Sequence, residues 1–254
     1  MKKNYFIITG TSRGIGEALA RQAMRAGDVV FCISRNENPS LRVEAMTKEF
    51  DLHEITLDLC ESSKIPAAVK GIFRQFDEEE VESITLVNNA GTIHPIRQIG
   101  SQEAREAIVR NISVNLTAAM LVTEHFVHET QGWSCDRRVV NLSTGAASRA
   151  VPGWSAYCSA KAGLKMYAAC LAEEQKAHPN PVKIVSFAPG VVDTQMQAEI
   201  RHSNPDAFPE LTKFKDYKDQ GTLISPRTVA EKLLELIRAS DFGEQREIDV
   251  RDRL

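Results

Sequence analysis

The chain has 254 residues, 43% of them hydrophobic, which is enough for one large α/β domain with a substantial core. Its formal net charge is −3, so we expect no broad basic surface for nucleic acid. No apolar run is long enough to cross a bilayer, and because a strand signal begins almost at once we expect no signal peptide. The five cysteines lack paired spacing, so we expect free thiols in a reducing, cytoplasmic setting.

The first predicted element is a buried strand over 5–9, followed by a glycine-rich turn and a helical pattern that ends at Gly27. This arrangement aims backbone N–H groups and a helix amino end at a pyrophosphate. The turn reads Gly10-x-x-x-Gly14-x-Gly16, which differs from the general dinucleotide fingerprint and from the Walker loop. We interpret it as a phosphate-binding turn, with an ordinary strand-to-helix turn as the alternative.

The second predicted strand, 29–33, ends at Ser34-Arg35-Asn36. An acid at this strand end suits the ribose 2′-hydroxyl of NAD, whereas an arginine suits a 2′-phosphate. Arg13, inside the glycine-rich turn, is placed to reach the same group, and a guanidinium grips a phosphate through a fixed fork. Two arginines on converging loops therefore favour NADP(H), although either one alone is equally typical of a solvated surface charge.

Strand and helix signals alternate through the rest of the chain. Further strands are predicted over 53–57, 83–87, 138–142, 182–187 and 246–250. Helices are predicted over 65–76, 102–129, 155–177 and 229–238, with the acidic run 77–80 as the solvated end of the first. This rhythm predicts an α/β fold, a doubly wound parallel sheet with helices on both faces, in a single domain covering residues 1–254. Residues 195–225 lack clean periodicity, and we expect them to be a substrate-loop insertion near the carboxyl edge of the sheet.

Tyr157 and Lys161 lie one helical turn apart, so a helix places both on one face. A tyrosine hydroxyl titrates near pH ~10, and a neighbouring ammonium favours the phenolate and lowers that pKa. The pair therefore predicts a tuned general acid/base. The alternative is an amphipathic helix with a lysine that extends its amine to solvent.

Five motifs occur in order along the chain: Gly10-x-x-x-Gly14-x-Gly16, Asn88-Asn89-Ala90-Gly91, Asn115, Tyr157-x-x-x-Lys161 and Pro189-Gly190. In this order they resemble the classical short-chain dehydrogenase/reductase family, over essentially the whole chain. The resemblance implies a Rossmann-type sheet, a nicotinamide cofactor and a catalytic set of tyrosine, lysine, serine and asparagine.

The resemblance also implies individual roles. Tyr157 would protonate the substrate carbonyl oxygen, Lys161 would lower the tyrosine pKa and hold the nicotinamide ribose, and Asn115 would distort the long helix and hold a proton-relay water. Asp58 would contact adenine, and Thr194 would hold the carboxamide. The full set expected around NADP(H) is Gly10, Ser12, Arg13, Gly14, Ile15, Gly16, Arg35, Asp58, Leu59, Asn89, Ala90, Gly91, Tyr157, Lys161, Pro189, Gly190, Val192 and Thr194.

One position departs from the family pattern. The catalytic serine of the family usually precedes the tyrosine by thirteen residues, and here that position is Thr144, with Ser143 just before it. Either hydroxyl is able to hydrogen-bond and polarise a carbonyl. Spacing favours Thr144 and chemical identity favours Ser143, and both remain candidates with a slight preference for Thr144.

Within the family, the carboxyl third resembles sepiapterin reductases and dicarbonyl (benzil-type) reductases. The matching stretches are Gly153-Trp154, Tyr157-Cys158, 192–197, 232–234 and Ile248-Asp249. By this resemblance Asp249 would anchor the guanidine-like edge of a pterin, the alternative being a solvated aspartate. Trp154 and Met196 would form walls around a flat substrate, or serve only in packing.

The sequence thus predicts an NADPH-dependent carbonyl reductase that acts on a small planar, often vicinal dicarbonyl substrate and forms an S-alcohol. The alternatives are a reductase of 3-oxoacyl thioesters or steroids, and a non-enzymatic NADP-sensing regulator. We expect no metal, nucleic-acid or membrane partner. We expect a homodimer or homotetramer, because relatives often pair through the helices that correspond to 102–129 and 155–177.

Overall fold

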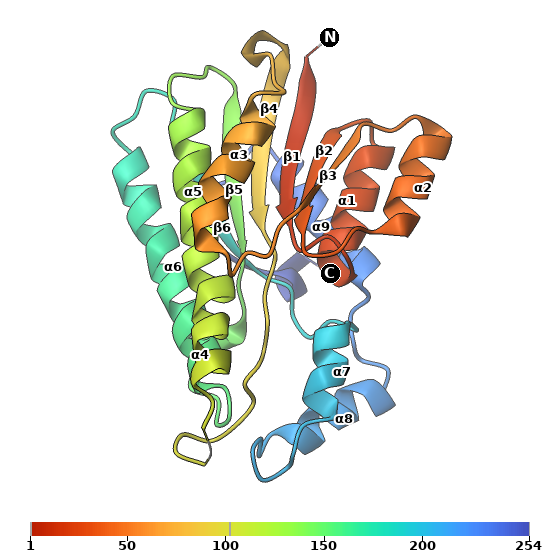
Figure 1. Cartoon of the computed structure of the whole chain (residues 1–254), viewed down its shortest axis with the longest axis vertical. Helices are drawn as coiled ribbons and strands as arrows, with labels where there is room; N and C mark the ends of the chain where they lie inside the picture. Colours follow the sequence, from red (N-terminus) through yellow and green to blue (C-terminus); the bar gives the residue numbers. More distant parts are fainter. Residues whose placement is uncertain (1, 102, 254) are drawn as a thin grey trace.

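The computed structural model describes residues 2–101 and 103–253, and in this part of the chain seven parallel strands form one sheet (Figure 1). The strands are β1 (Lys3–Thr9), β2 (Val29–Ser34), β3 (Leu52–Thr56), β4 (Val81–Asn88), β5 (Asp136–Leu142), β6 (Lys183–Ala188) and β7 (Glu247–Asp249). Their order is β3-β2-β1-β4-β5-β6-β7, so the winding reverses between β1 and β4. Ligands of such sheets bind in the crevice at this reversal. The predicted doubly wound parallel sheet is confirmed.

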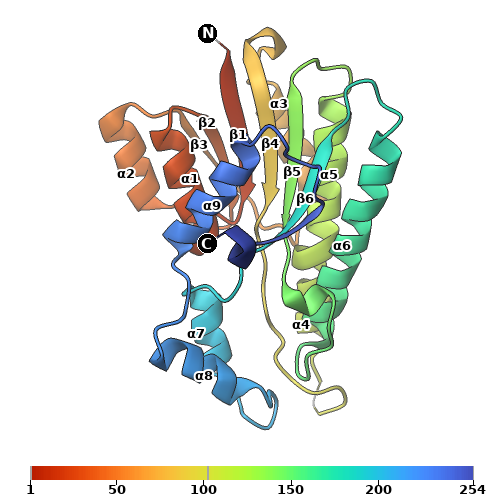
Figure 2. The ribbon, with the colours of Figure 1, turned by 180° about the vertical axis from the view of Figure 1, so that it is seen from behind.

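Helices cover both faces of the sheet (Figures 1 and 2). One face carries α1 (Gly14–Arg25), α2 (Pro39–Lys48) and α9 (Pro226–Arg238). The other carries α3 (Ile65–Phe73), α5 (Ala118–Glu129) and α6 (Ser155–Gln175), with α4 (Arg105–Ile112) preceding α5. Across the described ranges, no helix has both the length and the apolar character needed to span a bilayer.

The strands form where they do because both of their faces are buried. In β1, Phe6 and Ile8 pack under α1 and α9, whereas Tyr5 and Ile7 pack on the opposite face. Successive strand side chains point to opposite faces, so a strand covered on both sides is a continuous apolar run. Burying each large apolar side chain contributes about 1.5–3 kcal/mol. The run 5–9 was therefore a reliable strand prediction.

The predicted helix 102–129 is interrupted. It begins at Arg105 as α4, widens into a π-helical segment over Ser113–Thr117, and continues as α5. Residue 102 lies outside the described residues. Such π segments are rare and occur frequently at functional sites. Asn115 lies within this segment, and its role in causing the distortion stays a prediction.

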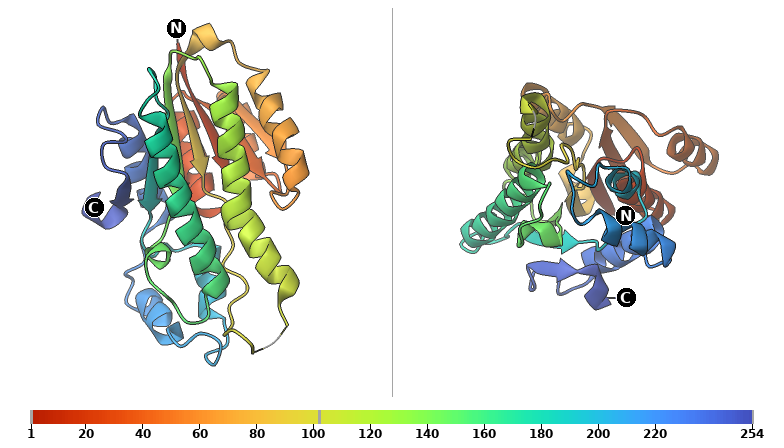
Figure 3. Two further views of the ribbon diagram at one scale, coloured as in Figure 1. Left: turned by 90° about the vertical axis from the view of Figure 1, so that its left-hand side faces the viewer. Right: turned by 90° about the horizontal axis from the view of Figure 1, so that it is seen from below.

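Residues 195–225 are more regular than the sequence indicated. They hold two short helices, α7 (Gln195–Arg201) and α8 (Leu211–Asp219), of 7 and 9 residues. Helices this short give no clear hydrophobic period. They lie beyond the carboxyl ends of the strands (Figures 1 and 3), the place expected for the insertion.

Smaller differences concern element boundaries. Helix α2 was not predicted, because its apolar residues form no clear stripe: only Leu41 and Ala45 are buried. The acidic run 77–80 forms a 3₁₀ turn (Glu78–Glu80) that leads into β4, and it is not the end of α3. The last strand is shorter than 246–250, because the chain turns at Val250 into a 3₁₀ segment.

Candidate active site

The glycine-rich turn follows β1 at the reversal of the sheet. Gly10 and Gly14 have φ of +76° and +66°, a left-handed conformation that favours glycine. A Cβ at Gly16 would lie 2.3 Å from the carbonyl oxygen of Gly10, so α1 begins in direct contact with the turn. The predicted strand–turn–helix arrangement is therefore present, with the amino end of α1 at the crevice.

The β4 loop is fastened to this turn. Asn89 Nδ2 donates to the carbonyl oxygens of Thr9 (2.9 Å) and Gly10 (3.0 Å). Thr9 Oγ1 in return accepts from the backbone N–H groups of Asn89 and Ala90, both at 3.0 Å. These four bonds fix the floor of the crevice between β1 and β4.

A cavity of about 470 Å³ opens above this floor. Most of the residues predicted to hold a cofactor line it, namely Gly10, Ser12, Arg13, Gly14, Ile15, Arg35, Asp58, Leu59, Asn89, Ala90, Gly91, Tyr157, Lys161, Pro189 and Thr194. Gly16 packs behind the turn instead, and Gly190 and Val192 line a neighbouring cavity. Thr194 caps α7 by accepting from the Gln197 N–H at 3.4 Å.

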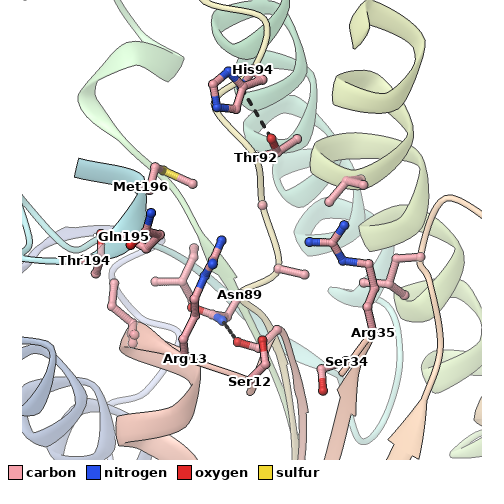
Figure 4. A pocket seen from close by; sticks show the side chains of 18 of the residues that line it. Ser12, Arg13, Ser34, Arg35, Asn89, Thr92, His94, Thr194, Gln195 and Met196 are labelled. Atoms are coloured by element: carbon pink, nitrogen blue, oxygen red, sulfur yellow. Dashed lines mark hydrogen bonds between the residues drawn. The ribbon is translucent and has the colours of Figure 1, made fainter. Parts of the chain in front are cut away.

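The side chains of Arg13 and Arg35 both point from the loops into this first cavity (Figure 4). Arg13 is paired with Glu199 of α7 at 3.6 Å, and Glu199 also contacts His94 Nε2 at 3.4 Å. Arg35 lies at the end of β2, on the side of Asp58. Together with Arg110 of α4, these arginines place three guanidinium groups in the lining of the first cavity, of which Arg13 is paired with Glu199 and Arg110 with Asp58.

Asp58 is held in a defined orientation. Its Oδ1 accepts from the Cys60 N–H at 3.0 Å, and its Oδ2 accepts from Arg110 Nη2 of α4, also at 3.0 Å. Burial works against ionisation, but these hydrogen bonds and the charges of Arg110 and Arg35 keep the pKa of Asp58 below its ordinary value. The carboxylate is thus ionised at neutral pH and fixed at the cavity wall.

A second cavity of about 320 Å³ adjoins the first. Its walls include the predicted Trp154, Met196 and Asp249, together with Phe214 of α8. Trp154 is buried and held by a parallel stack on Phe208, with ring centroids 4.9 Å apart. The second cavity therefore has a rigid aromatic wall that α8 completes.

Tyr157 lines both cavities, but its electrostatics differ from the sequence prediction. Burial raises the pKa of Tyr157 to about 12, although a hydrogen bond from Thr144 opposes this rise. Burial lowers the pKa of Lys161 to about 8. Lys161 Nζ donates to the carbonyl oxygen of Leu142 at 2.8 Å and lies 6.0 Å from the Tyr157 ring centroid. The lowering of the Tyr157 pKa that the sequence predicted from Lys161 is not found, because burial of the tyrosine has the largest effect on its pKa.

The two candidate hydroxyl groups occupy different places. Thr144 lines the second cavity and lies near enough to Tyr157 for its hydroxyl to oppose the rise in the tyrosine pKa; its Oγ1 accepts from the Ala146 N–H at 3.3 Å. Ser143 lines both cavities. The contact with Tyr157 favours Thr144 as the group that acts beside the tyrosine.

Asn115 lies behind the cavity wall and is fully engaged. Its Nδ2 donates to the Thr92 carbonyl oxygen (2.8 Å) and to Asn111 Oδ1 (2.9 Å), and its Oδ1 accepts from the Thr92 N–H (3.0 Å). Its side chain lies close enough to Gly91 that a Cβ there would be 2.9 Å from Oδ1. The side chain thus ties the π segment to the β4 loop, and its role in a proton relay stays a prediction.

The carboxylate of Asp249 is bound by the chain itself. Arg251 Nε donates to Oδ1 at 2.8 Å and Arg251 Nη2 donates to Oδ2 at 2.5 Å. This hydrogen bonding outweighs burial and keeps the pKa of Asp249 below its ordinary value. The predicted pterin anchor therefore lies at the second cavity but already holds a guanidinium group.

Several residues at the two cavities were missed from the sequence. Arg110, His94 and Glu199 line the first cavity, and Arg251 lines the second. The first three come from segments without a recognisable motif. The fourth had a usable signal, because an arginine two residues after a candidate anchoring aspartate is within reach of it.

Comparison with known proteins agrees with this geometry. A family model described as short chain dehydrogenase matches residues 4–205. The benzil reductase ((S)-benzoin forming) of Bacillus cereus is 41% identical over 96% of this chain and 99% of its own length. The sepiapterin reductase of Mus musculus is 30% identical over 97% of this chain and 96% of its own. A crystal structure of a Saccharomyces cerevisiae short chain dehydrogenase/reductase superposes with a TM-score of 0.81 at 23% identity, covering 97% of this chain and 95% of that one.

The crevice at the sheet reversal and the tyrosine–lysine helix thus occur in a chain that matches one family over most of its length. The chain belongs to the short-chain dehydrogenase/reductase family of oxidoreductases.

Proposed function

We propose that the chain is an NADPH-dependent carbonyl reductase that transfers hydride to a ketone of a small planar or vicinal dicarbonyl substrate. The observation that carries the proposal is the position of Tyr157, which lines both the crevice and the aromatic cavity. A proton donor on this shared wall serves a substrate in the second cavity when a nicotinamide cofactor occupies the first. The relative named for benzil reduction supports a dicarbonyl substrate.

The residues of the first cavity fit a phosphorylated dinucleotide. The glycine turn and the amino end of α1 suit a pyrophosphate, and the guanidinium groups of Arg13 and Arg35 suit a 2′-phosphate. We assign the adenine contact to Asp58 and the carboxamide contact to Thr194. When bound, the nicotinamide supplies the hydride.

The chain itself supplies the proton. Because the pKa of Tyr157 is raised to about 12, its hydroxyl is protonated at neutral pH and remains available to the oxygen of a carbonyl that is being reduced. The Thr144 hydroxyl, already beside Tyr157, donates to the same oxygen as negative charge develops there. Lys161 has a pKa of about 8, so its ammonium keeps its positive charge at neutral pH. This positive charge stabilises the negative charge that develops on the substrate oxygen.

The second cavity supports a small aromatic substrate. Ligand cavities range over about 300–1,000 Å³, and at about 320 Å³ this one is near the lower limit. Trp154 and Phe214 offer flat apolar surfaces. These features favour an aryl diketone over a steroid or a long acyl thioester. We expect the S-alcohol as the product.

The decisive experiment is reduction of benzil by the purified protein with NADPH or NADH, followed by cofactor absorbance and chiral chromatography. We expect NADPH to be preferred and (S)-benzoin to form. Tyr157→Phe should lower kcat by more than ~10²-fold and leave NADPH binding intact, because it removes only the proton donor. The proposal would be contradicted if none of the diketones tested supported NADPH oxidation, or if the Tyr157→Phe variant kept near-normal turnover.

A further inference from the structure

The last strand and the turn that follows it contribute to the wall of the second cavity. Strand β7 pairs with β6 so that Asp249 lies opposite Ala188, immediately before Pro189 and Gly190. All three of these β6-side residues line the second cavity, as do Asp249 and Arg251. Figure 2 shows β7's segment at the edge of the sheet, followed by the short carboxyl-terminal turn. A substrate that extends from Tyr157 towards this edge meets Asp249.

Both oxygens of the Asp249 carboxylate accept hydrogen bonds from Arg251. Arg251 binds both oxygens through Nε and Nη2 in a fork-to-fork pair, and the Arg251 backbone N–H donates to Oδ1 at 2.9 Å. A paired fork of this kind is the strongest geometry in which a carboxylate holds a planar cation. The guanidinium of Arg251 therefore takes the place that a planar substrate edge with two N–H donors would need.

The charges around the second cavity also disfavour a ligand with a guanidine-like edge. Among the described residues that line it, Arg149, Lys213 and Arg251 are cationic, and Asp249 is the one carboxylate. Arg149 is bound to Glu210 at 3.0 Å, so it has a partner outside the lining, whereas Asp249 is neutralised within it. The cavity as it stands offers no free anion to a guanidine- or amidine-bearing ligand.

We propose that Arg251 is a specificity-determining residue, which occupies Asp249 and thereby restricts the second cavity to neutral aromatic ketones, excluding heterocycles with a guanidine-like edge. This inference rests on the proposed function and narrows its substrate class. Arg251 is 71% exposed, so replacing it removes little packing. Its replacement should uncover a carboxylate that is already positioned at the end of the cavity.

The test compares benzil with sepiapterin, a ketone on a pterin ring, in the full-length protein with NADPH. Arg251→Gln removes the charged fork and keeps a side chain of similar reach. A freed carboxylate should form charge-assisted hydrogen bonds with the pterin edge, so the ratio of kcat/KM for sepiapterin to that for benzil should rise at least ~10-fold, mainly through KM. The double variant Arg251→Gln/Asp249→Asn should lose the gain, because the exposed acceptor pair is gone.

Arg149→Gln is the matched control, because it removes another arginine of the same cavity without uncovering Asp249. It should not raise the ratio. A wild-type protein that reduces sepiapterin as well as Arg251→Gln does would mean that Arg251 moves aside, and would overturn the inference. So would a gain that survives in the double variant.

Calorimetric binding of pterin itself separates this inference from the proposed function. Arg251→Gln should bind pterin at least ~10-fold more tightly than the wild type does, whether or not benzil is reduced. Failure to reduce benzil together with this gain would overturn only the proposed function. Equal pterin affinity in both proteins would overturn the role of Arg251 even if benzil is reduced.

Discussion

The neighbouring hydroxyl groups of Ser143 and Thr144 are the residue-level question on which the chemistry depends. Thr144 lies near enough to Tyr157 to affect the pKa of the tyrosine, whereas Ser143 lines both cavities. A donor that acts on developing oxyanion charge contributes about 10²–10³-fold to kcat. We expect Thr144→Ala to lower kcat by ~10²-fold with NADPH affinity preserved, and Ser143→Ala to do less. Steady-state kinetics with benzil measure both, and the reverse ranking would transfer the role to Ser143.

Arg35 decides the choice of cofactor in this interpretation. Arg35→Asp places a negative charge where a 2′-phosphate would lie and offers an acceptor to a free ribose hydroxyl. NADPH affinity should fall roughly 10–100-fold, the loss expected for a charge-assisted bond, and NADH should gain relative preference. Fluorescence titration with both nucleotides measures this change. Arg74→Asp, on the exposed end of α3, is the control and should leave both affinities unchanged; a wild type that prefers NADH would refute the assignment of Arg35.

At the level of single residues, the candidate site residues could be identified from the sequence, but their burial and their ion-pair partners could not. Tyr157, Lys161 and the glycine turn were identifiable because their spacing along one helix or one turn is itself the signal. The pKa of Tyr157 was predicted in the wrong direction, because its burial depends on elements far away in the sequence. The ion pair of Arg110 with Asp58 joins residues 52 positions apart, and no local sequence pattern predicts it.

At the level of elements, the predictable parts were those buried on both sides. The β1 and β2 runs are continuous apolar segments, and both strands were identified within a few residues. Helices α7 and α8 were missed because each has only two buried residues, so neither has an apolar stripe long enough to detect. Their stability comes from packing on Trp154, not from helix propensity.

This packing gives a prediction for α7 and α8. Phe208 is fully buried between Trp154 and Phe214. Phe208→Ala removes the stack, and such truncations cost about 3–5 kcal/mol when buried. Because α7 and α8 stand apart from the sheet, we expect them to open locally, so KM for benzil should rise and limited proteolysis should cut within 195–225.

The matched control is Phe126→Ala, which truncates an equally buried phenylalanine of α5. It should lower the temperature of global unfolding without creating the cleavage site in 195–225. If Phe208→Ala lowered the unfolding temperature as much as Phe126→Ala and produced no local cleavage, α7 and α8 would belong to the same cooperative unit as the sheet.

At the level of the whole molecule, the walls of the two cavities are formed by elements from the beginning to the end of the chain. The first lies at the carboxyl ends of β1 and β4, where the winding of the sheet reverses, and the second is lined by α8 and by the turn after β7. The outer surface of α4, α5 and α6 takes no part in either, and it carries the exposed apolar residues Val109, Met120 and Met166. Figure 3 shows α5 and α6 side by side on this flank, and Tyr167 of α6 donates to the Met120 carbonyl of α5.

We propose that two copies of the chain pair through this flank about a twofold axis, since a self-complementary apolar patch is what such an interface requires. The chain should sediment with about twice the 28.2 kDa mass of one copy, or four times if the dimers pair again. Met166, 65% exposed on α6, would be buried in the interface, so Met166→Glu should shift the protein towards the single-chain mass in analytical ultracentrifugation.

Met46→Glu is the control, because Met46 is 75% exposed on α2, on the opposite face of the sheet, and its replacement should not change the mass. A wild type that sediments as one copy would refute the pairing, whereas a dimer that persists in Met166→Glu would place the interface elsewhere.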